Sequence, residues 1–176
     1  MSIKIRQETP EDYQAVKGVI QAAFSDELLS DHSEHLLVER LRKSPAFVPE
    51  LSLVALESGK IVGHILLTRV GIRLDETVRE VLSLAPVSVD PVYQGRGIGG
   101  MLVNRAHEIA RELGFRAVVL IGYENYYPRF GYQSSSKYHI TFPFEAPAKN
   151  CMVLPLTDQP MEDLQGLVEY PEAFYH

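Results

Sequence analysis

The chain has 176 residues, of which 45% are hydrophobic and 23% charged, as in one ordinary globular domain. No apolar run reaches the roughly 18 residues that cross a bilayer, and with Cys151 as the single cysteine no internal disulfide can form. The net charge of −6 comes without a basic patch, so we do not expect binding to nucleic acid. The single cysteine and the absence of a long apolar run lead us to expect a cytoplasmic protein that does not bind membranes.

The first half of the chain alternates strand and helix signals. Thr9 and Pro10 form a helix start, with a threonine cap and a proline in the first turn, and Ser58-Gly59 is a hairpin turn signal. Pro86 lies inside an apolar strand, where proline indicates a bulge or a splayed strand pair. We predict a strand at 3–7, helices at about 9–24 and 33–44 with a polar break at 25–31 between them, and strands at 51–57, 61–70 and 79–89.

The second half predicts an amphipathic helix, a buried strand and several closing strands. From residue 101 apolar residues recur on one helical face until Gly114 ends the helix. The continuous apolar run at 117–121 indicates a strand that is buried on both faces. We further predict a short helix at 124–130 and strands at 139–144, 151–156 and about 167–170. Residues 1–156 are expected to form one domain, on which the acidic C-terminal tail 157–176 packs.

Residues 87–100 join the end of a buried strand to a glycine-rich loop and the start of the helix. Asp90-Pro91 ends the strand, because proline has no N–H for the ladder. Four glycines then follow within six residues, at 95, 97, 99 and 100. The unpaired N–H groups and the dipole of a helix start favour an anionic ligand, of which a phosphate or pyrophosphate is the natural example.

Three kinds of phosphate-binding loop can be compared with this stretch. A P-loop is excluded, since no Lys-Ser or Lys-Thr follows the glycines. A dinucleotide-binding fingerprint is formally present as Gly95-x-Gly97-x-x-Gly100, but five residues separate it from the strand end at Val89. The run Gln94-Gly-Arg-Gly-Ile-Gly99 has each fixed position of Gln/Arg-x-x-Gly-x-Gly/Ala, and it resembles the acyl-CoA loop of the GNAT N-acetyltransferases.

The likeness to this family extends along the chain and is greatest to its YhbS-like bacterial branch. Leu84-Ala-Pro, the Tyr-x-Arg-Phe-Gly stretch and the terminal Val-Glu-Tyr segment are similar to that branch. The resemblance implies an α/β fold, with a mixed central sheet whose fourth and fifth strands splay apart and with flanking helices. It also implies transfer of acetyl from acetyl-CoA to a primary amine of a small molecule or protein, by direct attack in a ternary complex and without a metal. A homodimer is among the expected assemblies.

The family pattern also assigns roles to residues of this chain. The Val87 N–H would polarise the acetyl carbonyl, and Tyr127, in Tyr-Pro-Arg-Phe-Gly-Tyr, would protonate the departing thiolate, so these two are the predicted catalytic residues. The predicted residues that bind acetyl-CoA are Val87, Val89, Gln94, Gly95, Arg96, Gly97, Ile98, Gly99 and Asn125. Arg129 is a candidate phosphate anchor.

Two positions depart from the family pattern. Ser83 stands where histone-acetylating members have a glutamate base, and Ile121 stands where the family has an asparagine, for which Asn125 is a candidate substitute. Candidate bases are therefore Glu80, His64, Glu124 or a chain of waters. The missing glutamate leaves an alternative function, a catalytically weak or inactive CoA-binding sensor or interaction module, and a dinucleotide-dependent oxidoreductase domain is a second. We expect the acceptor to enter between residues 24–27 and the strand at 62–68.

Overall fold

A computed structural model describes residues 2–28 and 30–175 of the chain. Positions 1, 29 and 176, which fall in the predicted domain, the polar break and the tail, lie outside the described residues. The helices are α1 (Tyr13–Phe24), α2 (Glu34–Arg42) and α3 (Ile98–Glu112). The strands are β1 (Ile3–Gln7), β2 (Phe47–Glu57), β3 (Lys60–Leu74), β4 (Thr77–Val89), β5 (Ala117–Ile121), β6 (Gln133–Ser134), β7 (Ile140–Thr141), β8 (Cys151–Pro155) and β9 (Gly166–Glu169).

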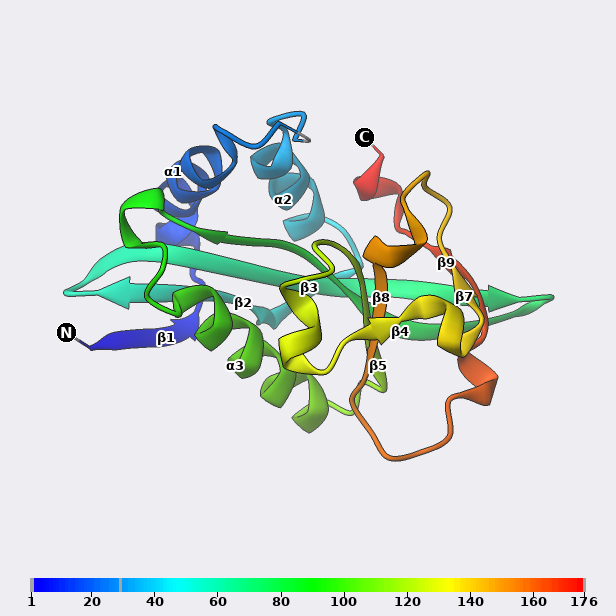
Figure 1. Ribbon diagram of the computed structural model, residues 1–176. Coiled ribbons are helices and arrows are strands. Elements are labelled where there is room, and N and C mark those ends of the chain that lie inside the picture. Colours follow the sequence, from blue (N-terminus) through cyan, green and yellow to red (C-terminus); the bar gives the residue numbers. More distant parts are fainter. Residues whose placement is uncertain (1, 29, 176) are drawn as a thin grey trace.

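The strands form a mixed sheet that is covered by helices on both faces (Figure 1). Its order is β1-β2-β3-β4-β5-β8-β6, with β9 added to the far half of β3 and β7 added to β9. Helices α1 and α2 pack on one face around Leu66, whereas α3 packs on the other around Ile65 and Leu67. The predicted α/β fold is therefore confirmed. Among the described residues, none of the helices has the length and apolar character that would span a membrane.

Two predicted segments are shorter in the structure, and one strand of the structure was not predicted. The helix expected at 124–130 is reduced to a 3-10 turn at Tyr127–Phe130, since Pro128 lacks the N–H that a longer helix would need. The strand expected at 139–144 pairs only at Ile140–Thr141, because His139 takes a left-handed conformation with φ of 56°. The two-residue strand β6 was not predicted, because its period-2 pattern is too short to recognise.

The feature that positions the site is the brief contact between β4 and β5. These parallel strands pair only at Leu82–Val118 and Ser83–Val119, although β4 continues to Val89. On the other edge of β4 the register with β3 shifts by one residue around Pro86, which confirms the predicted bulge. Beyond Ser83 the two central strands therefore diverge.

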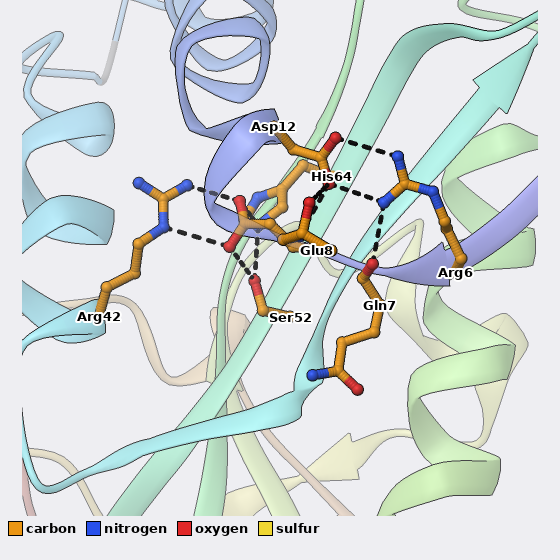
Figure 2. A network of polar contacts seen from close by, with 8 residues as sticks. Arg6, Gln7, Glu8, Asp12, Arg42, Ser52 and His64 are labelled. Carbon is orange, nitrogen blue, oxygen red and sulfur yellow. Dashed lines mark hydrogen bonds and ion pairs between the residues drawn. The ribbon is translucent and has the colours of Figure 1, made fainter.

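A buried ionic network ties the end of α2 to the sheet (Figure 2). The Arg42 guanidinium lies 2.6 Å from the Glu8 carboxylate, with side-chain exposures of 8% and 1%. The Ser52 hydroxyl donates to Glu8 at 2.8 Å and lies 3.1 Å from Nε2 of His64, which is fully buried. Arg42 also lies over the Tyr13 ring, 3.9 Å from its centroid. One charged pair thus connects α1, α2, strands β2 and β3, and the residue that follows β1.

Removing one member of this network should destabilise the protein strongly. We predict that Arg42→Met lowers the free energy of unfolding by about 3–5 kcal/mol, because it leaves the buried Glu8 carboxylate without a counter-charge. The matched control is Arg105→Met, whose ion pair with Glu108 is exposed and should contribute less than about 1 kcal/mol. Urea denaturation of both variants measures the difference, and equal losses would contradict the prediction.

The same network makes stability depend on pH. Burial first, and then the Arg42 charge, lower the pKa of His64 from 6.5 to about 3. Below pH 6.5 the unfolded chain therefore binds a proton that the folded chain does not. As the pH is lowered, this group reduces the free energy of unfolding by up to about 1.4 kcal/mol for each pH unit. We predict that His64→Gln makes the decline in unfolding free energy between pH 6.5 and 4.5 shallower. An unchanged slope in urea denaturation would contradict this.

Candidate active site

A cleft of about 860 Å³ opens where β4 and β5 diverge. Its volume lies within the range that is usual for small-molecule sites. Because α1 and α2 cover one face of the sheet and α3 the other, the cleft passes between the two layers. The walls are formed by α1, α2, the end of β4, the glycine loop with the first turn of α3, and the segment after β5. The lining residues include Phe24, Glu27, Glu34, Leu37, Leu84, Pro86, Val87, Ser88, Val89, Gln94, Gly97, Gly99, Tyr123, Tyr126, Tyr127 and Arg129.

The backbone of β4 presents hydrogen-bonding groups to this cleft. In an antiparallel ladder, opposed residues alternate between pairs that exchange both N–H···O bonds and pairs that exchange none. The Asp90 N–H donates to the Val62 carbonyl at 2.9 Å, so this pair is bonded. Val89 and Val87, one and three positions earlier on β4, therefore belong to unbonded pairs. Their N–H groups point away from β3, toward the side from which β5 has diverged.

The glycine loop leads from β4 into α3 with an open backbone. Gly95 and Gly97 have φ values of 81° and 78°, which residues with a Cβ rarely adopt, and Gly97 caps α3. The Gln94 side-chain amide donates to the Val89 carbonyl at 3.1 Å and so closes the loop onto the strand. The first turn of α3 lines the cleft, and its orphan N–H groups and helix dipole together make an anion-binding end.

Tyr127 lies on the opposite wall in a cluster of aromatic rings. Its ring centroid is 5.1 Å from that of Tyr126 and 5.8 Å from that of Tyr132. A Cβ on Gly122 would lie 2.5 Å from the Tyr127 ring, so only glycine leaves the ring its place. Burial raises the pKa of Tyr127 well above its usual value of 10. The phenol therefore stays protonated at neutral pH and can act as a proton donor.

His107 supports this cluster from α3. Its Nε2 lies 2.9 Å from the Tyr132 hydroxyl. Burial, followed by the charge of Arg111, lowers the pKa of His107 to about 4. The imidazole is thus neutral at pH 7, and its Nε2 can accept a hydrogen bond from the Tyr132 hydroxyl. It therefore holds the ring on which Tyr127 packs.

The structure brings most of the predicted site residues to the cleft wall, but two lie elsewhere. Val87, Val89, Gln94, Gly95, Gly97, Ile98, Gly99 and Tyr127 line the cleft. The Arg96 guanidinium pairs with Glu57 at 3.3 Å and lies over the Tyr93 ring. The backbone carbonyl of Asn125 accepts a hydrogen bond from Arg129. Arg129 itself lines the cleft.

The expected route for the acceptor needs correction. Residues 62–68 are buried between β2 and β4, and none of them lines the cleft, so that side of the predicted entrance is wrong. The candidate bases also lie away from it: His64 is inside the buried network, Glu80 pairs with Arg69, and Glu124 pairs with Lys149. Ser83 is buried where β4 pairs with β5.

Sequence reasoning missed five polar residues of the cleft: Glu34, Ser88, Tyr93, Tyr123 and Tyr126. Glu27, at the edge of the predicted entrance, does line the cleft. Its carboxylate accepts a hydrogen bond from the Tyr123 hydroxyl at 2.6 Å. Glu34, Ser88 and Tyr93 belong to separate elements, and the five residues have no motif spacing. A signal existed for Ser88, which lies between the two predicted valines, and for Tyr126, which directly precedes the predicted Tyr127.

Comparison with known proteins gives concordant matches. Residues 4–134 match the family model described as an Acetyltransferase (GNAT) domain. The uncharacterized N-acetyltransferase YjhQ of Escherichia coli K12 is 38% identical over 131 residues, which are 71% of each chain. The crystal structure of a GNAT family acetyltransferase from Brucella melitensis in complex with acetyl-CoA has a TM-score of 0.80 and 34% identity over 98% of each chain. That of YhbS from Escherichia coli in complex with CoA has a TM-score of 0.82 and 27% identity, covering 99% of this chain and 92% of that one.

The left-handed conformation of Gly97 can be tested by measuring the stability of a variant. We predict that Gly97→Ala lowers the free energy of unfolding by about 1–2 kcal/mol, because alanine must adopt the left-handed conformation there, although its Cβ would meet no atom within 4 Å. The matched control is Gly18→Ala within α1, which also has open space and should stabilise the protein by up to about 1 kcal/mol. We expect the two substitutions to change the free energy of unfolding in opposite directions, as measured by chemical denaturation.

Proposed function

The chain belongs to the GNAT family of acetyltransferases, and from this premise we propose that it transfers acetyl from acetyl-CoA to the primary amine of a small molecule or protein by direct attack. The observation that carries the proposal is the pairing of two features in one cleft. The outward-pointing amides of β4 face a gap in the sheet, and the N-terminus of α3 opens into the same space. A ligand with an amide-bearing arm and a diphosphate needs both.

The residues present fit the thioester, the pantetheine arm and the diphosphate of acetyl-CoA. Pantetheine amides can pair with the Val89 N–H as an added strand would, since β5 does not occupy that edge. The diphosphate suits the first turn of α3, where a side chain at Gly99 would crowd the Tyr126 hydroxyl at 3.1 Å. The thioester carbonyl would then accept from the Val87 N–H, which stabilises the negative charge that develops on its oxygen.

Proton and bond changes in the transfer balance without a further reactant. An alkylammonium, with a pKa near 10.4, first loses one proton to water. The lone pair of the neutral amine bonds to the carbonyl carbon, and the C–S bond breaks. Tyr127 gives its proton to the thiolate and regains one from the acylated nitrogen, directly or through water. The products are the acetamide, CoA with a free thiol, and the proton that was released first.

An inactive CoA-binding module is the alternative, and one observation favours it: the three candidate bases lie outside the cleft and Ser83 is paired to β5. The position of Tyr127 in the cleft supports turnover instead. A thermal shift with acetyl-CoA together with thiol release over a panel of amines separates the two, because the module would bind acetyl-CoA and release no thiol. Family membership removes the dinucleotide-dependent alternative.

Tyr127 offers a direct test of the mechanism. We predict that Tyr127→Phe lowers kcat by about 100-fold or more, because the thiolate then leaves without a proton donor, while the KM for acetyl-CoA changes little. Steady-state thiol release measures both constants. Tyr138→Phe is the matched control, since that hydroxyl donates to Gln133 outside the cleft. Unchanged turnover in Tyr127→Phe would remove this phenol from the mechanism.

A further inference from the structure

The charged side chains of the cleft are unevenly placed. Among the residues that line it, the charged ones are Glu27, Glu34 and Arg129. Arg129 lies over the Tyr126 ring beside the start of α3, whereas both glutamates come from the α1–α2 side. The cleft thus has an anion-binding part at α3 and an acidic part at the helix pair.

Neither of these two carboxylates forms an ion pair with another described residue. Within the described residues their side-chain partners are hydroxyl groups: Glu27 accepts from Tyr123 at 2.6 Å, and Glu34 accepts from Ser30 at 2.8 and 2.6 Å. Hydroxyl donors carry no charge, so neither carboxylate is neutralised. Both side chains belong to partly buried residues, where a cation would be bound more strongly than on an open surface.

A second polar feature lies deeper in the cleft wall. Ser88 is only 2% exposed, and its hydroxyl has no hydrogen-bond partner within residues 2–28 and 30–175. It stands between Val87 and Val89 and faces His64 across the ladder, on the face that α1 and α2 cover. Because buried polar groups are nearly always satisfied, this hydroxyl is suited to a ligand that donates to it. An amine nitrogen next to the Val87 amide would do so.

Part of the cleft wall is apolar. Phe24 and Leu37 from the helices, with Leu84 and Pro86 from β4, line the same cleft. A chain of methylene groups would lose its contact with water there.

The reacting nitrogen must lose its charge before attack, and a neighbouring carboxylate would oppose that by stabilising the ammonium form. Glu27 and Glu34 are therefore suited to a charge that does not react. Resting on the acetyl-transfer function proposed above, we propose that the acceptor is an aliphatic amine with a second cationic group, of the diamine or polyamine class. Its reacting nitrogen binds at Ser88, its methylene chain contacts the apolar wall, and its distant ammonium pairs with Glu27 and Glu34.

The test compares α,ω-diaminoalkanes with n-alkylamines of the same chain length, at one pH and with saturating acetyl-CoA. We expect kcat/KM to be about 10- to 100-fold higher for the diamine at the best length, as is typical of a hydrogen-bonded charge pair. The Glu27→Gln/Glu34→Gln double variant should lose most of that ratio. The matched control is Glu108→Gln on the exposed face of α3, which should retain it. Ser88→Ala should lower kcat/KM for both amines alike, because it acts on the nitrogen that they share.

The outcomes separate this inference from the function on which it rests. Equal kcat/KM for monoamine and diamine, or a ratio that survives in the double variant with an unchanged thermal unfolding midpoint, would overturn the inference and leave acetyl transfer intact. Thiol release with neither amine, in a protein that acetyl-CoA still stabilises against heat, would overturn the proposed function and this inference with it.

Discussion

The structure depends on a parallel strand pair that is joined at two positions and then separates. Backbone N–H and C=O groups inside a sheet must find partners, so a gap within the sheet is stable only where side chains, water or a ligand satisfy them. Here β4 keeps its ladder with β3 through a bulge at Pro86 and leaves its other edge open. That open edge, rather than any single side chain, defines where an amide-bearing ligand can lie.

The buried ion pair acts on the same site from a distance. Arg42 is the last residue of α2 and Glu34 is the first, so the network that holds Arg42 against Glu8 also fixes the helix that presents Glu34 to the cleft. A well-packed apolar replacement could be as stable as a buried ion pair. The guanidinium of Arg42 nevertheless binds the Glu8 carboxylate in a defined orientation, and this orientation holds α2 in a fixed position beside the cleft.

Charge is divided along the cleft in a way that matches the chemistry. The helix dipole and open amides of α3 suit a diphosphate, whereas Glu27 and Glu34 suit a cation. Ser88 and Tyr127 are neutral groups that also line the cleft. In the proposed reaction the amine would be uncharged at Ser88 and the thiolate would gain a proton from Tyr127, so two substrates of opposite charge would react among neutral groups.

The sequence by itself determined the cofactor half of the site, because residues 87–100 are contiguous and their spacing reflects local backbone geometry: a strand end, two left-handed glycines and a helix start. The same local signals predicted the main helices and strands, whereas Tyr127 was assigned by its resemblance to the family's tyrosine motif. Only the tertiary structure brings together the residues for which we propose an acceptor role. Glu34 and Ser88 come from distant elements and line the same cleft through packing, which leaves no periodic trace in the chain. It also decided that His64 and Glu80 do not line the cleft, since burial and pairing depend on neighbours far along the sequence.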